Sequence, residues 1–289
     1  MVNMFVATMH NTILFFTENG KCFWLKVYQI PEGARAGKGR AIQNLINIEK
    51  EDTVKTFVNV KDLKDNEYIN NNYIVLATKK GVIKKTRLEA YSRPRQNGIN
   101  AIIVREGDML LDARLTDGNK EIMLAVRSGK AIRFHEETVR AVGRTASGVK
   151  GITLGGPKDE VVGIVTAKQD EQDILVISEN GFGKRSALED YRITNRGGKG
   201  VKTINITEKT GDLIAIKAVT DEDDLMIITQ NGIAIRLAVR GVRVMGRNTQ
   251  GVRLINLRDG DQIAAATQVP ANGEDEDNGE GDTEDVADQ

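Results

Sequence analysis

Short apolar runs alternate with basic and acidic segments along this chain, and the pattern recurs five times. Each unit begins with a nearly continuous, β-branched apolar run, which is typical of a strand covered on both faces. A tight turn with glycine follows, and Asn-Gly in such a turn is a strong hairpin signal. The five first strands are predicted at 13–16, 73–78, 122–126, 174–177 and 225–229.

Two glycines in each unit define the period of the repeat. The first lies in the hairpin turn, 17 to 19 residues before the second. The pairs are Gly20 with Gly39, Gly81 with Gly98, Gly129 with Gly148, Gly181 with Gly200, and Gly232 with Gly251. After the second glycine apolar and polar residues alternate, which predicts strands at 41–48, 99–104, 149–154, 201–206 and 252–257. An acidic turn then leads into a closing apolar strand. Residues 61–72, between the first two units, are polar and are expected to form a loop. The pattern therefore predicts about four strands per unit and no long helix.

The repeat length decides the fold class. A unit of about fifty residues made of strands cannot bury both faces of its own sheet, so successive units must pack against one another. We therefore predict an all-β, propeller-like domain of about five visible four-stranded blades over residues 1–270. The blades are expected at about 9–60, 73–117, 121–167, 173–219 and 224–269, and residues 1–8 as the closing strand of a preceding or final blade.

Charge divides the chain into a basic body and an acidic end. Residues 271–289 carry nine acidic side chains and no basic ones, although the whole chain has a net charge of zero. This tail has little to bury, so we expect it to be disordered. It is interpreted either as a solubilising end or as an internal mimic of a polyanion that competes for the basic body.

Basic residues recur at the same places in successive units. An arginine stands four residues before the second glycine in four units, and a lysine or arginine follows the first glycine by three or four residues in four units. In a ring, such positions form a curved positive track, where glycine turns let backbone N–H groups approach phosphate. The alternative is that these charges are solvated and protect edge strands from pairing with other chains.

Duplex DNA is the polyanion that the composition favours. Aromatic residues make up 4% of the chain, so few side chains can stack on unpaired bases, and no helix is predicted that could enter a major groove. Binding is then expected to involve the DNA backbone and to weaken with salt. The residues predicted to contact DNA are Arg35, Lys38, Arg40, Lys84, Lys85, Arg93, Arg95, Arg133, Arg144, Lys150, Lys184, Arg185, Arg196, Lys199, Lys202, Arg236, Arg247 and Arg253.

Catalytic and metal-binding patterns are missing from the sequence. The two histidines, His10 and His135, lie far apart and near no cysteine pair, so neither a metal site nor a cofactor is predicted. The chain has one cysteine, no apolar run near the roughly eighteen residues that span a membrane, and no signal peptide pattern. We therefore expect a cytoplasmic, nucleoid-associated domain without catalytic residues of its own.

Four segments together resemble one known family: residues 26–32, 78–86, 180–185 and 246–252. With the acidic tail, they make residues 1–270 similar to the C-terminal DNA-wrapping domain of DNA gyrase A, whose blades form a β-pinwheel. The resemblance implies that the domain wraps duplex DNA and so supports ATP-dependent negative supercoiling by a type IIA topoisomerase. It also implies two partners, the N-terminal cleavage domain of gyrase A and the gyrase B protein, and ATP and magnesium would be bound by those other parts.

The signature box of that family, Gln-Arg-Arg-Gly-Gly-Lys-Gly, has its nearest match in the fourth unit. The match is the turn Asn195, Arg196, Gly197, Gly198, Lys199 and Gly200. Because the box belongs to the first blade of the family, the chain is expected to be a fragment that lacks this blade. Two alternatives stay open: the equivalent C-terminal domain of topoisomerase IV, which relaxes and decatenates DNA, and a protein-binding propeller scaffold.

Overall fold

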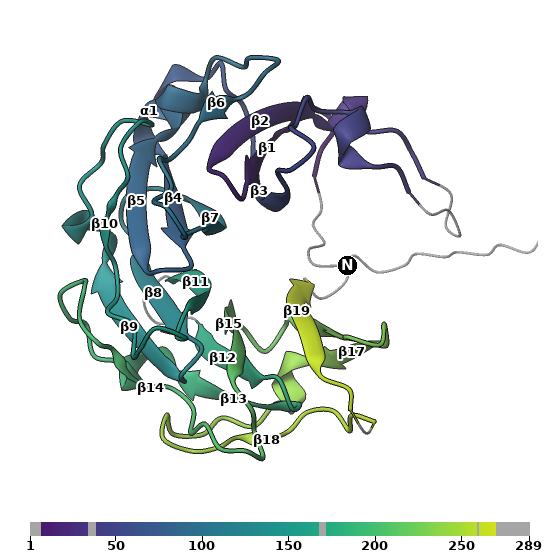
Figure 1. Cartoon of the computed structure of the whole chain (residues 1–289), viewed down its shortest axis with the longest axis vertical. Coiled ribbons are helices and arrows are strands. Elements are labelled where there is room, and N and C mark those ends of the chain that lie inside the picture. The colour runs from purple at the N-terminus through teal and green to yellow at the C-terminus, as the bar shows by residue number, and fades with distance from the viewer. Residues whose placement is uncertain (1–6, 34–38, 168–171, 259, 270–289) are drawn as a thin grey trace, which may run out of the picture.

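Five antiparallel sheets follow one another around a ring, in chain order (Figure 1). The computed structural model describes residues 7–33, 39–167, 172–258 and 260–269. The predicted all-β, propeller-like architecture is confirmed. The residues expected to form a strand at 1–8 and a disordered tail at 271–289 lie mostly or wholly outside this range. No helix in the described part of the chain is long and apolar enough to cross a membrane.

Each unit supplies three long strands to its own blade. The central strands of the first four blades are buried along their whole length or nearly so, as predicted, whereas buried and half-buried residues alternate along that of the fifth. They are β1 (Thr12–Thr17), β4 (Tyr73–Thr78), β8 (Glu121–Val126), β12 (Asp173–Ser178) and β16 (Asp224–Thr229). Their hairpin partners are β2 (Lys21–Lys26), β5 (Val82–Arg87), β9 (Lys130–His135), β13 (Phe182–Ala187) and β17 (Ala234–Ala238). The closing strands are β3 (Val54–Val60), β7 (Leu110–Thr116), β11 (Val161–Ala167), β15 (Leu213–Val219) and β19 (Ile263–Val269).

The fourth strand of a blade comes from the next unit along the chain. Each is a two-residue strand that pairs with the hairpin strand of the preceding blade. These exchanged strands are β6 (Ile99–Asn100), β10 (Val149–Lys150), β14 (Val201–Lys202) and β18 (Val252–Arg253). The prediction placed this strand in its own unit, and that assignment is wrong. Exchange satisfies the backbone groups of the hairpin strand, which would otherwise form an open sheet edge.

The two ends of the repeat depart from the four-stranded prediction. The fifth sheet has three strands, β17-β16-β19, and no described segment pairs with the outer edge of β17. In the first unit, the strand predicted at 41–48 is instead a 3₁₀ turn, η2 (Ile42–Asn44). This segment has no preceding blade to pair with among the described residues, so alternation of apolar residues alone does not make it a strand. The predicted loop at 61–72 contains a short helix, α1 (Asn66–Asn71), which Asp65 caps.

In the first four units, the first glycine is where the exchanged strand docks. Gly81 has φ +82°, and its carbonyl accepts the amides of Gly151 at 2.8 Å and Ile152 at 3.3 Å. A Cβ on Gly81 would lie 2.9 Å from the Ile152 carbonyl oxygen, which is too close. In the last blade, a Cβ on Gly232 would meet no atom within 4 Å, because no strand among the described residues docks there. Glycine therefore recurs at this position because both the hairpin turn and the docking of the exchanged strand require it.

The hydrophobic core lies between neighbouring blades rather than within one. Leu14 and Phe16 of β1 pack in one cluster with Leu76 of β4 and Tyr91 at the end of the 3₁₀ turn η3 (Leu88–Tyr91). The Phe16 and Tyr91 rings meet edge to face with centroids 5.9 Å apart. Each blade therefore depends on the next for burial, as expected of a repeat protein. Related 3₁₀ turns follow the other hairpin strands: η1 (Val27–Gln29), η4 (Glu136–Thr138), η5 (Leu188–Asp190) and η6 (Val239–Gly241).

Candidate nucleic-acid interface

The exchanged strands lie at the outer edges of the blades (Figure 1), and three of the four carry a basic residue. Lys150, Lys202 and Arg253 are each the second residue of an exchanged strand, and all three side chains are exposed. Strand exchange therefore repeats one exposed cation from blade to blade. We call these three residues the strand cations. The same position in β6 is Asn100, which is uncharged.

A second row of basic residues connects neighbouring exchanged strands. The guanidinium of Arg144 donates to the carbonyl of Asn100 at 3.2 Å, that of Arg196 to Lys150 at 3.1 Å, and that of Arg247 to Lys202 at 2.8 Å. In each case, the arginine of one unit binds the second residue of the preceding unit's exchanged strand. We call Arg144, Arg196 and Arg247 the brace arginines. A guanidinium has five donors, so each brace keeps N–H groups for a phosphate.

Two of the brace arginines are held from a second side as well. Arg196 also donates through Nε to the Thr138 carbonyl at 3.0 Å, and the Arg247 guanidinium lies 5.7 Å from the ring centroid of Tyr191. All three brace side chains are half-buried. Their orientation is therefore fixed before any ligand arrives, which lowers the entropic cost of binding.

A third row was missed by the sequence analysis. Arg140, Arg192 and Arg243 are exposed, and each stands four residues before a brace arginine. Each follows a buried residue that closes a 3₁₀ turn, which are Val139, Tyr191 and Val242. The signal was present as Arg-x-x-x-Arg-x-x-x-Gly in three successive units. We call these three residues the leading arginines, and the three rows together form the basic rim.

Five residues predicted to contact DNA are instead buried. The exposed fractions of Lys84, Lys85, Arg133, Lys184 and Arg185 are 7% or less. This corrects their assignment to an exposed track. They follow the first glycine within a hairpin strand, and the loops of the next unit cover that strand. Sequence spacing alone did not distinguish them from the exposed strand cations.

Lys84 and Lys184 join blades through backbone carbonyls. The Lys84 ammonium donates to the carbonyls of Ala101 and Arg144, both at 2.6 Å, and the Lys184 ammonium donates to the Gly246 carbonyl at 2.5 Å. Burial lowers the pKa of each lysine to about 8, and a nearby brace arginine contributes to that lowering. These lysines therefore stabilise the position of the loop that carries the braces.

Lys85, Arg133 and Arg185 bind the 3₁₀ turn of the next blade. Arg133 donates to the carbonyls of Leu188 at 2.6 Å and Tyr191 at 3.0 Å, and its charge is balanced by buried Glu121. Arg185 donates to the Val242 carbonyl at 2.8 Å, and Lys85 to the Glu136 carbonyl at 3.1 Å. Arg236 holds the same register position in the last blade, where it is exposed and pairs with Asp224 at 2.6 Å.

The other predicted residues are placed more simply. Arg40, Arg93, Arg95 and Lys199 are exposed, whereas Arg35 and Lys38 lie outside the described residues. The box-like turn from Asn195 to Gly200 packs on the segment that directly follows β10. The Gly197 amide donates to the Gly151 carbonyl at 2.6 Å, and the Thr153 hydroxyl donates to the Gly197 carbonyl at 2.6 Å. In this position of the turn, Lys199 is exposed to solvent and lies close in sequence to Arg196.

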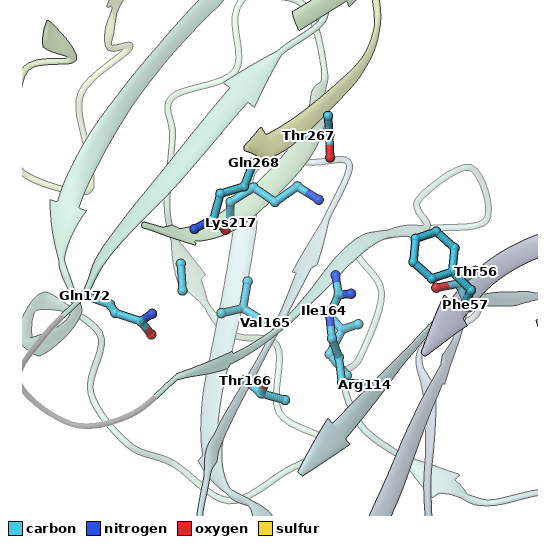
Figure 2. Close-up of a pocket in the computed structure, with 11 residues that line it drawn as sticks. Thr56, Phe57, Arg114, Ile164, Val165, Thr166, Gln172, Lys217, Thr267 and Gln268 are labelled. Carbon is cyan, nitrogen blue, oxygen red and sulfur yellow. The ribbon is translucent and has the colours of Figure 1, made fainter. Parts of the chain in front are cut away.

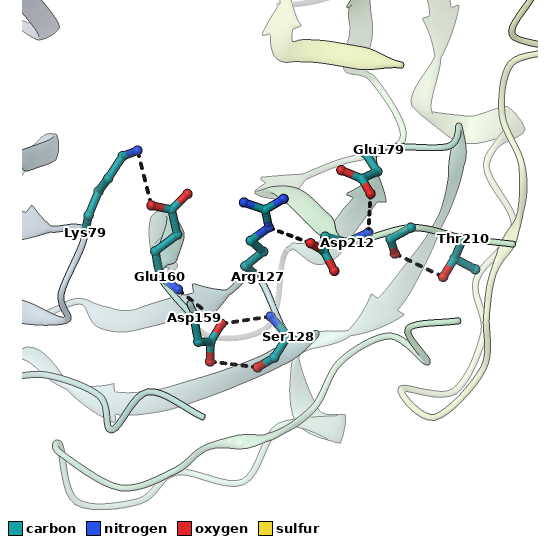
Figure 3. Close-up of polar contacts among 9 residues, drawn as sticks. Lys79, Arg127, Ser128, Asp159, Glu160, Glu179, Thr210 and Asp212 are labelled. Atoms are coloured by element: carbon teal, nitrogen blue, oxygen red, sulfur yellow. Dashed lines mark hydrogen bonds and ion pairs between the residues drawn. The ribbon is translucent and has the colours of Figure 1, made fainter. Parts of the chain in front are cut away.

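The carboxylates of the acidic turns form hydrogen bonds and ion pairs within the fold. Asp159 accepts the amide of Ser128 at 3.0 Å and its hydroxyl at 2.8 Å, which closes the hairpin turn of that blade (Figure 3). Neighbouring blades are joined by ion pairs of Lys79 with Glu160 at 3.2 Å and Arg127 with Asp212 at 2.5 Å (Figure 3). Carboxylates are therefore engaged in turns and interblade pairs, while no ion pair within the described range is recorded for the basic rim.

Strand-exchanging blades with a basic outer rim define a β-pinwheel, a propeller-like repeat domain. A family described as the DNA gyrase C-terminal domain, beta-propeller, matches residues 11–61, 72–117, 120–168, 172–220 and 223–270. The chain belongs to this family, which confirms the resemblance seen in the sequence. It is 45% identical over 270 residues to the DNA gyrase A protein of Staphylococcus aureus (strain NCTC 8325 / PS 47), covering 93% of this chain and 30% of that protein.

Two solved structures share the fold. The C-terminal domain of DNA topoisomerase IV aligns with a TM-score of 0.80 at 24% identity, over 91% of this chain and 80% of that one. The DNA gyrase A C-terminal domain aligns with a TM-score of 0.77 at 23% identity, over 91% and 83%. At this identity they establish the architecture alone, and the gyrase assignment comes from the family match and the relative. The chain spans about a third of the length of that relative.

Proposed function

We propose that this chain binds duplex DNA along its basic rim and bends it around the outside of the ring. The observation that carries the proposal is the repetition of the leading arginine, brace arginine and strand cation in three successive units. Nine positive groups in equivalent places follow the curve of the blades, as a bent phosphate backbone requires. Many modest phosphate contacts offset the cost of bending, which is on the order of several kcal/mol.

In this proposal the domain acts as part of DNA gyrase. Wrapped DNA is presented to the N-terminal cleavage domain of gyrase A, and the gyrase B protein supplies the ATP-dependent step, so that turnover introduces negative supercoils. The 45% identity to a gyrase A protein favours this role over the relaxing and decatenating role of topoisomerase IV. We place the complex on the chromosome in the cytoplasm, since DNA is its substrate. No chemical step is assigned to this chain.

The salt dependence of DNA binding tests the role of the rim. Replacing Lys150, Lys202 and Arg253 with Gln removes three phosphate contacts, so the log–log slope of affinity against salt should become shallower by about 2.7. The measurement is fluorescence anisotropy of a labelled duplex across a salt series.

A matched control removes equal charge from the acidic turns. Lys50, Arg105 and Lys158 are exposed cations that precede β3, β7 and β11, outside the rim. Their combined replacement with Gln should leave the slope within about 0.5 of the unchanged chain. Equal changes in the two triple variants would show that net charge, and not the rim, determines binding.

A further inference from the structure

The five closing strands surround a polar cavity on the inner side of the ring (Figure 2). Its volume is about 360 Å³, and β3, β7, β11, β15 and β19 all contribute to its lining. A second cavity of about 290 Å³ shares Thr56, Arg114 and Lys217 with it. The basic rim has no part in either cavity, so the DNA-binding proposal does not account for the cations found here.

Strand register places two cations at the same level of this cavity. Arg114 of β7 pairs with Val75, and Lys217 of β15 pairs with Leu175, and both partners are the third residue of a central strand. Thr267 of β19 occupies the equivalent position opposite Met226. Figure 2 shows the side chains of Arg114 and Lys217 extending into the space between the closing strands.

Only one of the two cations is paired with a carboxylate. Arg114 pairs with Asp112 at 2.7 Å, and the Thr56 hydroxyl donates to the same carboxylate at 2.7 Å. Lys217 has no hydrogen-bond or ion-pair partner for its ammonium group among the described residues. Burial lowers the pKa of Lys217, Arg114 lowers it further, and Asp112 opposes both effects. Lys217 is half-buried, and an ammonium that has lost part of its water without gaining a partner is costly. An anion in the cavity would remove that cost.

The rest of the lining suits an oxyanion. Thr166, Thr267, Gln172 and Gln268 add hydroxyl and amide groups around the two cations. Donors of these kinds bind phosphate oxygens, and arginine contributes several from one planar group. The volume lies within the range of small-molecule sites, about 300–1,000 Å³.

We propose that Arg114 and Lys217 bind a small oxyanion of the phosphate class inside the ring. The site is separate from the DNA-binding rim and is built from strands of blades two to five with Thr56 of blade one. Carboxylates of residues 271–289 offer a second source of oxyanion, because β19 leads directly into that acidic segment. The experiment therefore includes a variant in which its nine acidic residues are replaced with Asn or Gln.

Isothermal titration calorimetry of the full chain with inorganic pyrophosphate tests the site. We expect binding that Lys217→Met weakens by about tenfold to a hundredfold, as for loss of one charge-assisted hydrogen bond. Lys50→Met removes an exposed lysine outside both the rim and the cavity and is the matched control, so pyrophosphate affinity should be unchanged in it. If the acidic segment competes, the variant with a neutralised segment should bind pyrophosphate more tightly than the unchanged chain, and Lys217→Met should abolish that gain.

Thermal unfolding gives a second readout that does not depend on titration heats. Pyrophosphate should raise the melting temperature of the unchanged chain and of Lys50→Met, but not that of folded Lys217→Met. Equal binding by Lys217→Met and the unchanged chain would overturn the proposal. So would an equal loss in Lys50→Met, or no binding by either the unchanged chain or the neutralised variant at millimolar pyrophosphate.

Discussion

Strand exchange makes a quantitative prediction at the hairpin glycines. Gly81 and Gly232 have the same conformation, with φ of +82° and +83°. Alanine at either position is strained by about 1–2 kcal/mol because of the left-handed backbone. Only at Gly81 does the new Cβ meet the incoming strand, at 2.9 Å from the Ile152 carbonyl oxygen and 3.0 Å from its Cγ2.

The difference between the two variants measures the docking of the exchanged strand. In Gly81→Ala the clash displaces the amides of Gly151 and Ile152, which now bond the Gly81 carbonyl at 2.8 and 3.3 Å. Loss of one or two such bonds costs about 1–3 kcal/mol beyond the backbone strain. We therefore expect Gly81→Ala to lower the free energy of unfolding by about 2–5 kcal/mol, and Gly232→Ala by about 1–2 kcal/mol.

Denaturant unfolding and amide hydrogen exchange check this prediction together. Exchange should accelerate at Gly151 and Ile152 in Gly81→Ala, and these amides should keep their protection in Gly232→Ala. Hydrogen exchange also separates local opening from global loss of stability, which matters because blades of a repeat protein can unfold separately. Equal destabilisation by both variants, with unchanged protection at Gly151, would refute the docking argument.

Three further predictions concern the charged groups. The Lys84 pKa is about 8 in the folded chain against an ordinary 10.5, so the unfolded state binds more protons between these two pH values. The free energy of unfolding of the unchanged chain should therefore rise relative to that of Lys84→Ile as pH increases from 8 to 10.5. Denaturant unfolding across that pH range measures this difference. Isoleucine suits the site because Ile132 fills it in blade three. Arg196→Lys keeps the charge but loses the directed brace, so the unfolding free energy should fall by about 1 kcal/mol while the salt slope of DNA binding stays unchanged; a shallower slope would contradict this. Neutralising the nine acidic residues of 271–289 should tighten DNA binding at low salt, measured by anisotropy, and equal affinity would leave the segment a solubilising end.

The repeat itself could be predicted because its causes are local. Apolar runs, hairpin glycines and acidic turns each depend on a few adjacent residues, and together they specified the strands and the ring. The partner of the exchanged strand could not be predicted, because alternation at Val149 and Lys150 is the same whichever blade the strand joins. Gly81 was identified as a turn residue, but its second role appears only when the Ile152 carbonyl lies against it.

The rim was predicted in part, for a related reason. Lys84 and Lys150 are both lysines in short strands, and their difference in burial follows from the loop of another unit that covers Lys84. The brace arginines were identified by spacing, yet their contact with the preceding exchanged strand needs three-dimensional packing. Arg140 and its equivalents were recognisable from spacing, but only the Arg-x-x-x-Gly part of the Arg-x-x-x-Arg-x-x-x-Gly pattern was used.

The central claim, that DNA follows the curve of the rim, is tested most directly by topology. Nicked circular DNA is sealed by ligase in the presence of increasing amounts of this chain, and the linking-number distribution is then measured. We predict a shift of the distribution with one sign, which grows with protein and disappears in the variant lacking Lys150, Lys202 and Arg253. Salt-sensitive binding without any shift, or an equal shift by that variant, would contradict wrapping along the rim.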